Sequence, residues 1–98
     1  MAMTVNTEGL LVRATLSGDL SVADLAVLKG QLLPALDAEG TLLVDAEHLT
    51  RLDTSVVQLF LYAARCVRAL RVEVGSPAWV SAWATLGLSP SEQASTTE

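Results

Sequence analysis

Several kinds of residue are scarce in this sequence, and each shortage excludes a class of structure or function. Aromatic side chains make up only 4% of the 98 residues, so a hydrophobic core has to be filled mainly by Leu, Val and Ala. The single cysteine, Cys66, cannot form an intramolecular disulfide and is typical of a reducing compartment. One histidine, His48, together with one cysteine does not supply the ligands of a zinc site.

Basic residues are also scarce, which argues against two kinds of partner. The chain has six Lys and Arg residues against eleven Asp and Glu, with a net charge of −5. Nucleic acids and anionic membrane surfaces both require clustered positive charge, so neither is an expected partner. No apolar run approaches the ~18 residues that a membrane helix needs, and the first residues lack the pattern of a signal peptide. We therefore expect a cytoplasmic protein without direct membrane insertion.

The chain does contain enough apolar surface for one folded domain. Hydrophobic residues make up 51% of the chain and charged residues 17%, unlike the composition of intrinsically disordered proteins. The length suits one domain and is short for two. We assign residues 1–88 to this domain and residues 89–98, which are mostly Ser, Thr and Glu, to a disordered tail.

The first half of the sequence predicts a hairpin followed by a helix. Residues 10–16 are rich in aliphatic and β-branched side chains, and residues 3–7 are expected to pair with them. Ser21 begins a helix, with Asp24 three positions later as a weak form of the capping box. Pro34 is expected to kink this helix. Its apolar residues recur at helical spacing, namely Leu25, Leu28, Leu32, Leu33 and Leu36.

The second half predicts strands that alternate with helices. Residues 41–45 form a short apolar run, which is typical of a central strand buried on both faces. We expect a helix over 53–70, a strand over 71–74 and a last helix that Ser76 caps. A helix on each side of the central strand predicts a parallel βαβ unit. The predicted core contains Leu43, Val44, Phe60, Ala63, Val67 and Trp83.

Groups that could catalyse a reaction are few, and we expect neither an enzyme nor a cofactor. His48 is predicted to lie in an exposed loop, and the chain has no glycine-rich phosphate loop. Asp45 ends the central strand, as does the phospho-acceptor of receiver domains, which makes a receiver-like or hydrolytic enzyme an alternative. The acidic pair and the lysine that accompany that aspartate in receiver domains are missing. We interpret Asp45 as a turn or capping carboxylate.

The most informative stretch is residues 51–57, Arg-Leu-Asp-Thr-Ser-Val-Val. Asp53 stands where the N-cap of a helix belongs, and the hydroxyls of Thr54 and Ser55 follow it. One interpretation is ordinary helix capping. The other is that a hydroxyl exposed at this helix N-terminus accepts a phosphate from a kinase, because free N–H groups and the helix dipole favour an anion there.

Four segments together resemble the STAS domain, a module shared by anti-sigma factor antagonists and the tails of sulfate transporters. The segments are 16–21, a turn before the first helix; 42–46, the central strand; 52–55, Leu-Asp-Thr-Ser, which resembles the family's Asp-Ser-Ser-Gly signature; and 76–88, the last helix. The resemblance spans roughly residues 3–88. It implies an α/β fold with a mostly parallel sheet of four to five strands, one antiparallel edge and three to four packed helices.

The resemblance also implies a bacterial signalling role through protein–protein interaction. In anti-sigma factor antagonists, a partner kinase of the histidine-kinase-like ATPase fold phosphorylates the first hydroxyl after the signature Asp. Carried over by position, that residue is Thr54, with Ser55 as the second choice. Unphosphorylated protein binds the partner, and phosphorylated protein releases it. Such a phosphoprotein switch is the leading hypothesis.

Two departures from the family pattern favour an alternative. Val56 stands where the signature usually has Gly, and Ser21 stands where an acidic residue is common. Some STAS proteins are constitutive adaptors that dock on a transporter ATPase, as in lipid-transport systems, or on a chemotaxis-like sensory complex. This role requires no phosphorylation.

The expected docking surface is the outer face of the helix predicted over 53–70. Its residues follow helical spacing and combine apolar with basic side chains, as the cores of protein interfaces do. They are Asp53, Thr54, Gln58, Leu61, Tyr62, Arg65 and Arg68.

Overall fold

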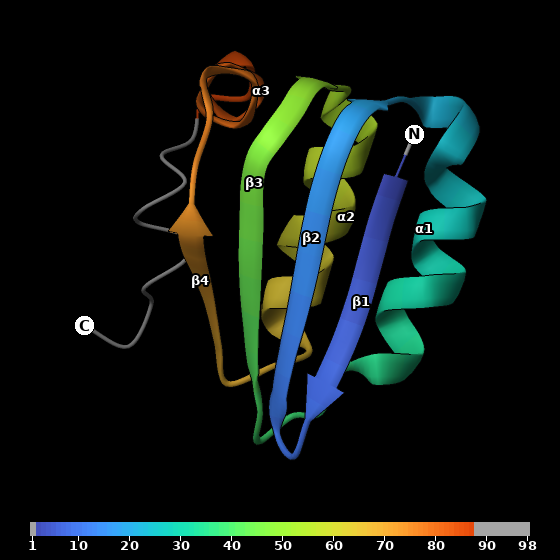
Figure 1. Ribbon diagram of the computed structural model, residues 1–98, viewed down its shortest axis with the longest axis vertical. Helices are drawn as coiled ribbons and strands as arrows, with labels where there is room; N and C mark the ends of the chain where they lie inside the picture. The colour runs from blue at the N-terminus through green and yellow to red at the C-terminus, as the bar shows by residue number, and fades with distance from the viewer. Residues whose placement is uncertain (1, 88–98) are drawn as a thin grey trace.

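Four strands form one mixed sheet with helices packed against it (Figure 1). The computed structural model describes residues 2–87, and the predicted tail at 89–98 lies outside them. The strands are β1 (Ala2–Glu8), β2 (Leu11–Leu20), β3 (Thr41–Leu52) and β4 (Ala69–Val74). The helices are α1 (Leu25–Leu32), α2 (Thr54–Arg65) and α3 (Pro77–Thr85). In the order β1-β2-β3-β4, only β1 and β2 pair antiparallel, which confirms the expected α/β arrangement.

Gly40 occupies the point where three segments of the chain meet. A Cβ atom at this position would lie 2.3 Å from the Leu10 carbonyl oxygen, so only glycine fits without a shift of the backbone. The neighbouring N–H of Thr41 donates to that same Leu10 oxygen, and the N–H of Arg68 donates to the Gly40 carbonyl. This contact brings the starts of β2, β3 and β4 together at one end of the sheet.

The first helical segment follows the sequence prediction closely. The Asp24 carboxylate accepts hydrogen bonds from the backbone N–H and the hydroxyl of Ser21, at 2.9 and 3.2 Å. The segment opens with a 3₁₀ turn (Val22–Asp24) before α1 begins. A second 3₁₀ turn (Leu33–Ala35) contains Pro34 and ends the α-helical geometry, as the missing N–H of proline requires.

Helix α2 is shorter than the sequence predicted. It ends at Arg65, with the half-buried Cys66 as its C-cap, rather than at Leu70. Leu70 belongs to β4, where it pairs with Leu42 of β3. The prediction was wrong because buried apolar residues continue at helical spacing into the strand, and sheet pairing outweighs that local preference.

The central strand was also predicted incorrectly, in length and in burial. Strand β3 continues to Leu52, so His48 lies exposed within the strand and not in a loop. Buried and half-buried residues alternate along its first half, and Leu43 is only half-buried. Since α1 and α2 cover one face of the sheet (Figure 1), Leu43 points to the opposite face and is absent from the core. The other five predicted core residues are buried together.

Three aromatic side chains join α2 to α3. Phe60 and Trp79 meet edge to face, with ring centroids 5.5 Å apart, and Trp79 and Trp83 are 5.4 Å apart. All three are at most 1% exposed. The indole N–H groups of Trp79 and Trp83 find no hydrogen-bond partner among residues 2–87, so this cluster holds by packing alone.

No helix in the same range is both long and apolar enough to cross a membrane.

We predict that Phe60→Ala lowers the free energy of unfolding by about 3–5 kcal/mol, because it removes buried surface and leaves a cavity beneath Trp79. Urea denaturation followed by circular dichroism measures the change. Val80→Ala, at a side chain that is 53% exposed on α3, is the matched control and should change stability little. Equal denaturation midpoints for Phe60→Ala and wild type would contradict the packing of α2.

Candidate functional site

The start of α2 is held by hydrogen bonds on both sides of Asp53. Its carboxylate accepts from the backbone N–H of Ser55 at 2.9 Å and from the Ser55 hydroxyl at 2.7 Å. Its own N–H donates to the Leu20 carbonyl at 2.9 Å. The predicted N-cap is therefore confirmed, and it joins the end of β2 to the start of α2.

These contacts also affect the acidity of Asp53. The hydrogen bond from the Ser55 hydroxyl, followed by the one from the Ser55 backbone N–H, lowers the pKa of Asp53 below its usual 3.8, and the charge of Arg51 adds to the effect. Both hydrogen bonds stabilise the ionised carboxylate. Asp53 is thus a charged cap at neutral pH.

The two hydroxyls after Asp53 are in different situations. The Ser55 hydroxyl is engaged by the Asp53 carboxylate. Thr54 is half-buried at the first position of α2, and its hydroxyl has no hydrogen-bond partner among the described residues. Thr54 therefore has the hydroxyl that is available to a partner or to a modifying enzyme.

A groove of about 450 Å³ lies beside this helix start, between α1 and α2. One wall comes from α1 and the turn after it, at spacings of four residues, and the other wall comes from α2. The lining residues are Leu25, Lys29, Leu33, Ser55, Gln58, Leu59 and Tyr62. The groove offers apolar surface together with amine, amide and phenol groups, which suits recognition of another molecule more than chemistry.

The structure places some of the predicted docking residues together and separates others. Gln58 and Tyr62 line the groove, and Arg65 is exposed at the end of the same helix. Leu61 is half-buried and packs against the core, so it is not the exposed apolar residue that we expected. Arg68 follows α2 in the turn before β4 and does not lie on the outer face of the helix. Leu61 lies at the margin of the buried face of α2, and Arg68 was misplaced because the helix ends earlier than predicted.

The α1 side of this surface was missed in the sequence. Lys29 is the only lysine of the chain, and within residues 2–87 it forms no ion pair. Leu25 and Leu33, which the sequence showed only as apolar residues at helical spacing, pack against the core and line the groove. Val22, two residues after Leu20, is 62% exposed. The spacing of Leu25, Lys29 and Leu33 was the signal that could have identified this wall.

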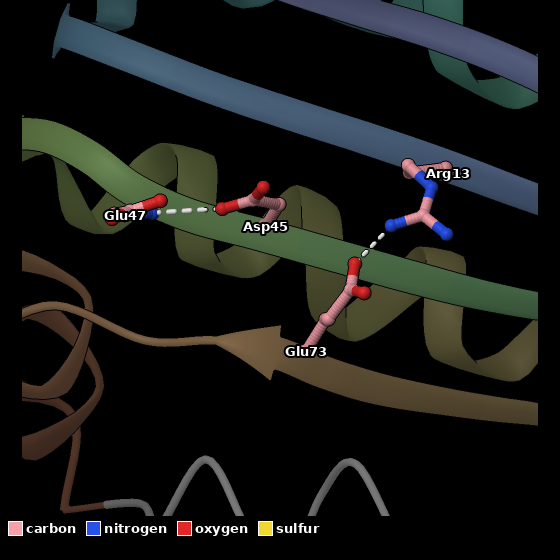
Figure 2. A network of polar contacts seen from close by, with 4 residues as sticks. All are labelled: Arg13, Asp45, Glu47 and Glu73. Atoms are coloured by element: carbon pink, nitrogen blue, oxygen red, sulfur yellow. Dashed lines mark hydrogen bonds and ion pairs between the residues drawn. The ribbon is translucent and has the colours of Figure 1, made fainter.

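The opposite face of the sheet carries a polar network that includes Asp45 (Figure 2). The Asp45 carboxylate accepts the N–H of Glu47 at 3.0 Å, so its role as a local capping carboxylate is consistent with the structure. Arg13 forms an ion pair with Glu73 from β4. Among the described residues, no three His, Cys, Asp or Glu side chains are grouped as a metal site would require.

The lowered pKa of Asp53 predicts how its contribution to stability depends on pH. A folded-state pKa below the unfolded value stabilises the fold above about pH 3.8, and the contribution is lost as the pH falls through the lowered pKa. Asp53→Asn should therefore melt below wild type at neutral pH, and the difference should shrink below about pH 3.8. Thermal melts across pH measure this, with Glu8→Gln at the exposed hairpin end as control. A difference independent of pH would contradict the charged cap.

Comparison with known proteins gives one clear result. No curated protein sequence matches the chain. The family model described as "Mlab, STAS domain" matches residues 3–86, which include all of the sheet except Ala2 and the whole of α1, α2 and α3. STAS domains are generally protein-interaction and regulatory modules without catalytic activity. This chain belongs to the STAS domain family.

Proposed function

We propose that this STAS domain is an adaptor that docks a partner protein on the start of α2 and on the groove between α1 and α2. Two observations carry the proposal: no hydrogen bond within residues 2–87 engages the Thr54 hydroxyl, and an apolar groove begins at its neighbour Ser55. A partner that fills the groove can reach the Thr54 hydroxyl at the start of the helix.

The surface has the apolar content of a protein interface. Tyr62 is 56% exposed and lines the groove together with the half-buried Leu25 and Leu33. Apolar side chains that line one groove are typical of interaction sites, whereas a single exposed leucine is not. The partner is expected to fill the groove with an apolar side chain.

The charges of the surface indicate what surrounds that side chain. Lys29 and Arg65 are exposed on it, although the chain as a whole carries a net charge of −5. Its two carboxylates, Asp24 and Asp53, accept hydrogen bonds from Ser21 and Ser55 and keep their negative charge. The surface therefore carries both signs, and the partner is expected to place an acidic residue against Lys29 in the groove.

The partner that we favour is the ATPase subunit of a transport system. The matching family model carries the name Mlab. In addition, Val56, which replaces the glycine of the STAS signature, is fully buried in the core. Because Val56 anchors the start of α2 in the core, this part of the helix should keep the same conformation with and without a partner. Such a surface suits an adaptor that binds its partner constitutively.

The second candidate is an anti-sigma factor antagonist that a partner kinase switches off by phosphorylating Thr54. The observation in its favour is that Thr54, and not Ser55, has the free hydroxyl. A phosphate there would add roughly −1.5 to −2 charges next to Asp53 and would have to be desolvated in the complex. Both effects oppose binding of the partner.

We predict that Thr54→Glu weakens partner binding at least tenfold, or about 1.4 kcal/mol. The fold should remain intact, because a negative charge is favourable at a helix N-terminus. Isothermal titration calorimetry with the isolated partner measures the affinity. Thr7→Glu adds the same charge at the other end of the sheet and should bind like wild type. Equal affinities for the two variants would remove Thr54 from the interface.

We predict that Lys29→Glu also weakens binding at least tenfold, since it reverses the charge inside the groove without loss of a buried group. Leu61→Asp is unsuitable for this test because Leu61 packs against the core. Gln31→Glu, at an exposed position of α1 that does not line the groove, is the control for added negative charge. If both variants bind like wild type, the partner docks elsewhere.

One experiment separates the two candidate roles. The tagged protein is purified from its native host, and mass spectrometry identifies its partner and the state of the Thr54 peptide. A transporter ATPase with unmodified Thr54 supports the adaptor. A histidine-kinase-like ATPase with phosphorylated Thr54 supports the switched antagonist, and in that case Thr54→Ala should retain the partner permanently.

A further inference from the structure

The face of the sheet that lies opposite α1 and α2 is open within residues 2–87 (Figure 1). Strands β2, β3 and β4 pair in parallel, and parallel sheets are almost always covered on both faces. This face is not fully polar, because Leu43 of β3 and Leu11 at the start of β2 are half-buried on it. A protein surface with these properties needs a cover.

The charged residues of this face are arranged in two rows across the strands. Arg13 of β2, Leu43 of β3 and Arg71 of β4 are register partners, so they form one basic row with an apolar centre. Towards the carboxyl ends of the strands lie Asp45 of β3 and Glu73 of β4, which we call the acidic row, although an irregularity in the pairing makes Val74 the register partner of Asp45. Figure 2 shows Asp45 and Glu73 on the same side of the sheet as Arg13.

We propose that this face binds the same face of a second copy of the chain. A two-fold axis that runs parallel to the rows, and between them, places the basic row of each copy opposite the acidic row of the other. A two-fold interface uses one patch twice and has to be self-complementary. On β4 the two rows have this property, because Arg71 of each copy lies opposite Glu73 of the other. On β3, Leu43 of one copy lies opposite Asp45 of the other, whose carboxylate already accepts the N–H of Glu47.

The free charges within each copy agree with this arrangement. Glu73 pairs with Arg13 across β3, but Arg71 forms no ion pair among the described residues. In the pair of copies, Arg71 of one lies opposite Glu73 of the other, which already holds one guanidinium and has acceptor sites left for a second. The contact occurs twice, once on each side of the axis.

The size of the face is sufficient for a specific interface. Figure 1 looks onto this face along the shortest dimension of the molecule, and the molecule measures 29 × 28 Å in the plane of that view. Stable interfaces bury roughly 800 Å² per partner. The face lies on the other side of the sheet from the groove between α1 and α2, so a second copy and a partner protein do not compete.

The test is a charge-reversal experiment on the full chain, analysed by sedimentation equilibrium. Wild type should form a dimer, whereas Arg71→Glu and Glu73→Arg should each dissociate at least tenfold more readily, because like charges then oppose across the axis. An equimolar mixture of the two variants should dimerise again, since the acid introduced at position 71 meets the base introduced at position 73 and the second contact remains native. Misfolding of either variant could not produce this recovery.

A second pair of variants tests the apolar centre. Leu43→Asp should abolish the dimer and leave the melting temperature close to that of wild type, because Leu43 is outside the core. Val80→Asp places the same charge on an exposed site of α3 and should dimerise normally. The proposal is overturned if the wild-type protein stays monomeric at a concentration 100 times higher than a micromolar dissociation constant. Mixed charge variants that stay monomeric, or Leu43→Asp that still dimerises, overturn it as well.

Discussion

The packing of α2 against the sheet is the contact on which the other features of this domain depend. Val56, Phe60 and Ala63 are fully buried on one side of the helix, which determines the direction of every other side chain on it. The hydrogen bond from Asp53 to the Leu20 carbonyl holds the start of the helix at the same time. Because close-packed cores do not allow a helix to rotate gradually, the outward surface of α2 is as well defined as the core beneath it.

The sequence was informative where structure depends on neighbouring residues. Asp53 and Ser76 were each expected to cap a helix, and each side chain accepts a backbone N–H of the first turn. It was less informative where structure depends on distant pairing. Leu70 continues the helical spacing of α2, yet it pairs with Leu42 in the sheet. No local pattern records that contact, so the end of α2 and the burial of β3 could not be obtained from the sequence.

The candidate site was visible in the sequence only on the α2 side. Its other wall comes from Leu25 and Leu33, whose spacing is the same for a leucine in the core and for one that lines a groove. Only the placement of α1 against α2 shows whether such a leucine is in the core or lines the groove. The choice between Thr54 and Ser55 has a similar cause, because it depends on which hydroxyl the Asp53 carboxylate engages. The sequence motif alone fits either hydroxyl as the free one.

The two proposed surfaces lie on opposite sides of one sheet, and this arrangement has a consequence for assembly. Two copies joined through their open faces would present two docking surfaces that point away from each other. A partner with one site would bind each copy independently, whereas a partner that is itself paired would gain affinity only if its two sites span the whole dimer. Since the surfaces share no residue, a variant that loses one interaction should keep the other, and the two proposals can fail separately.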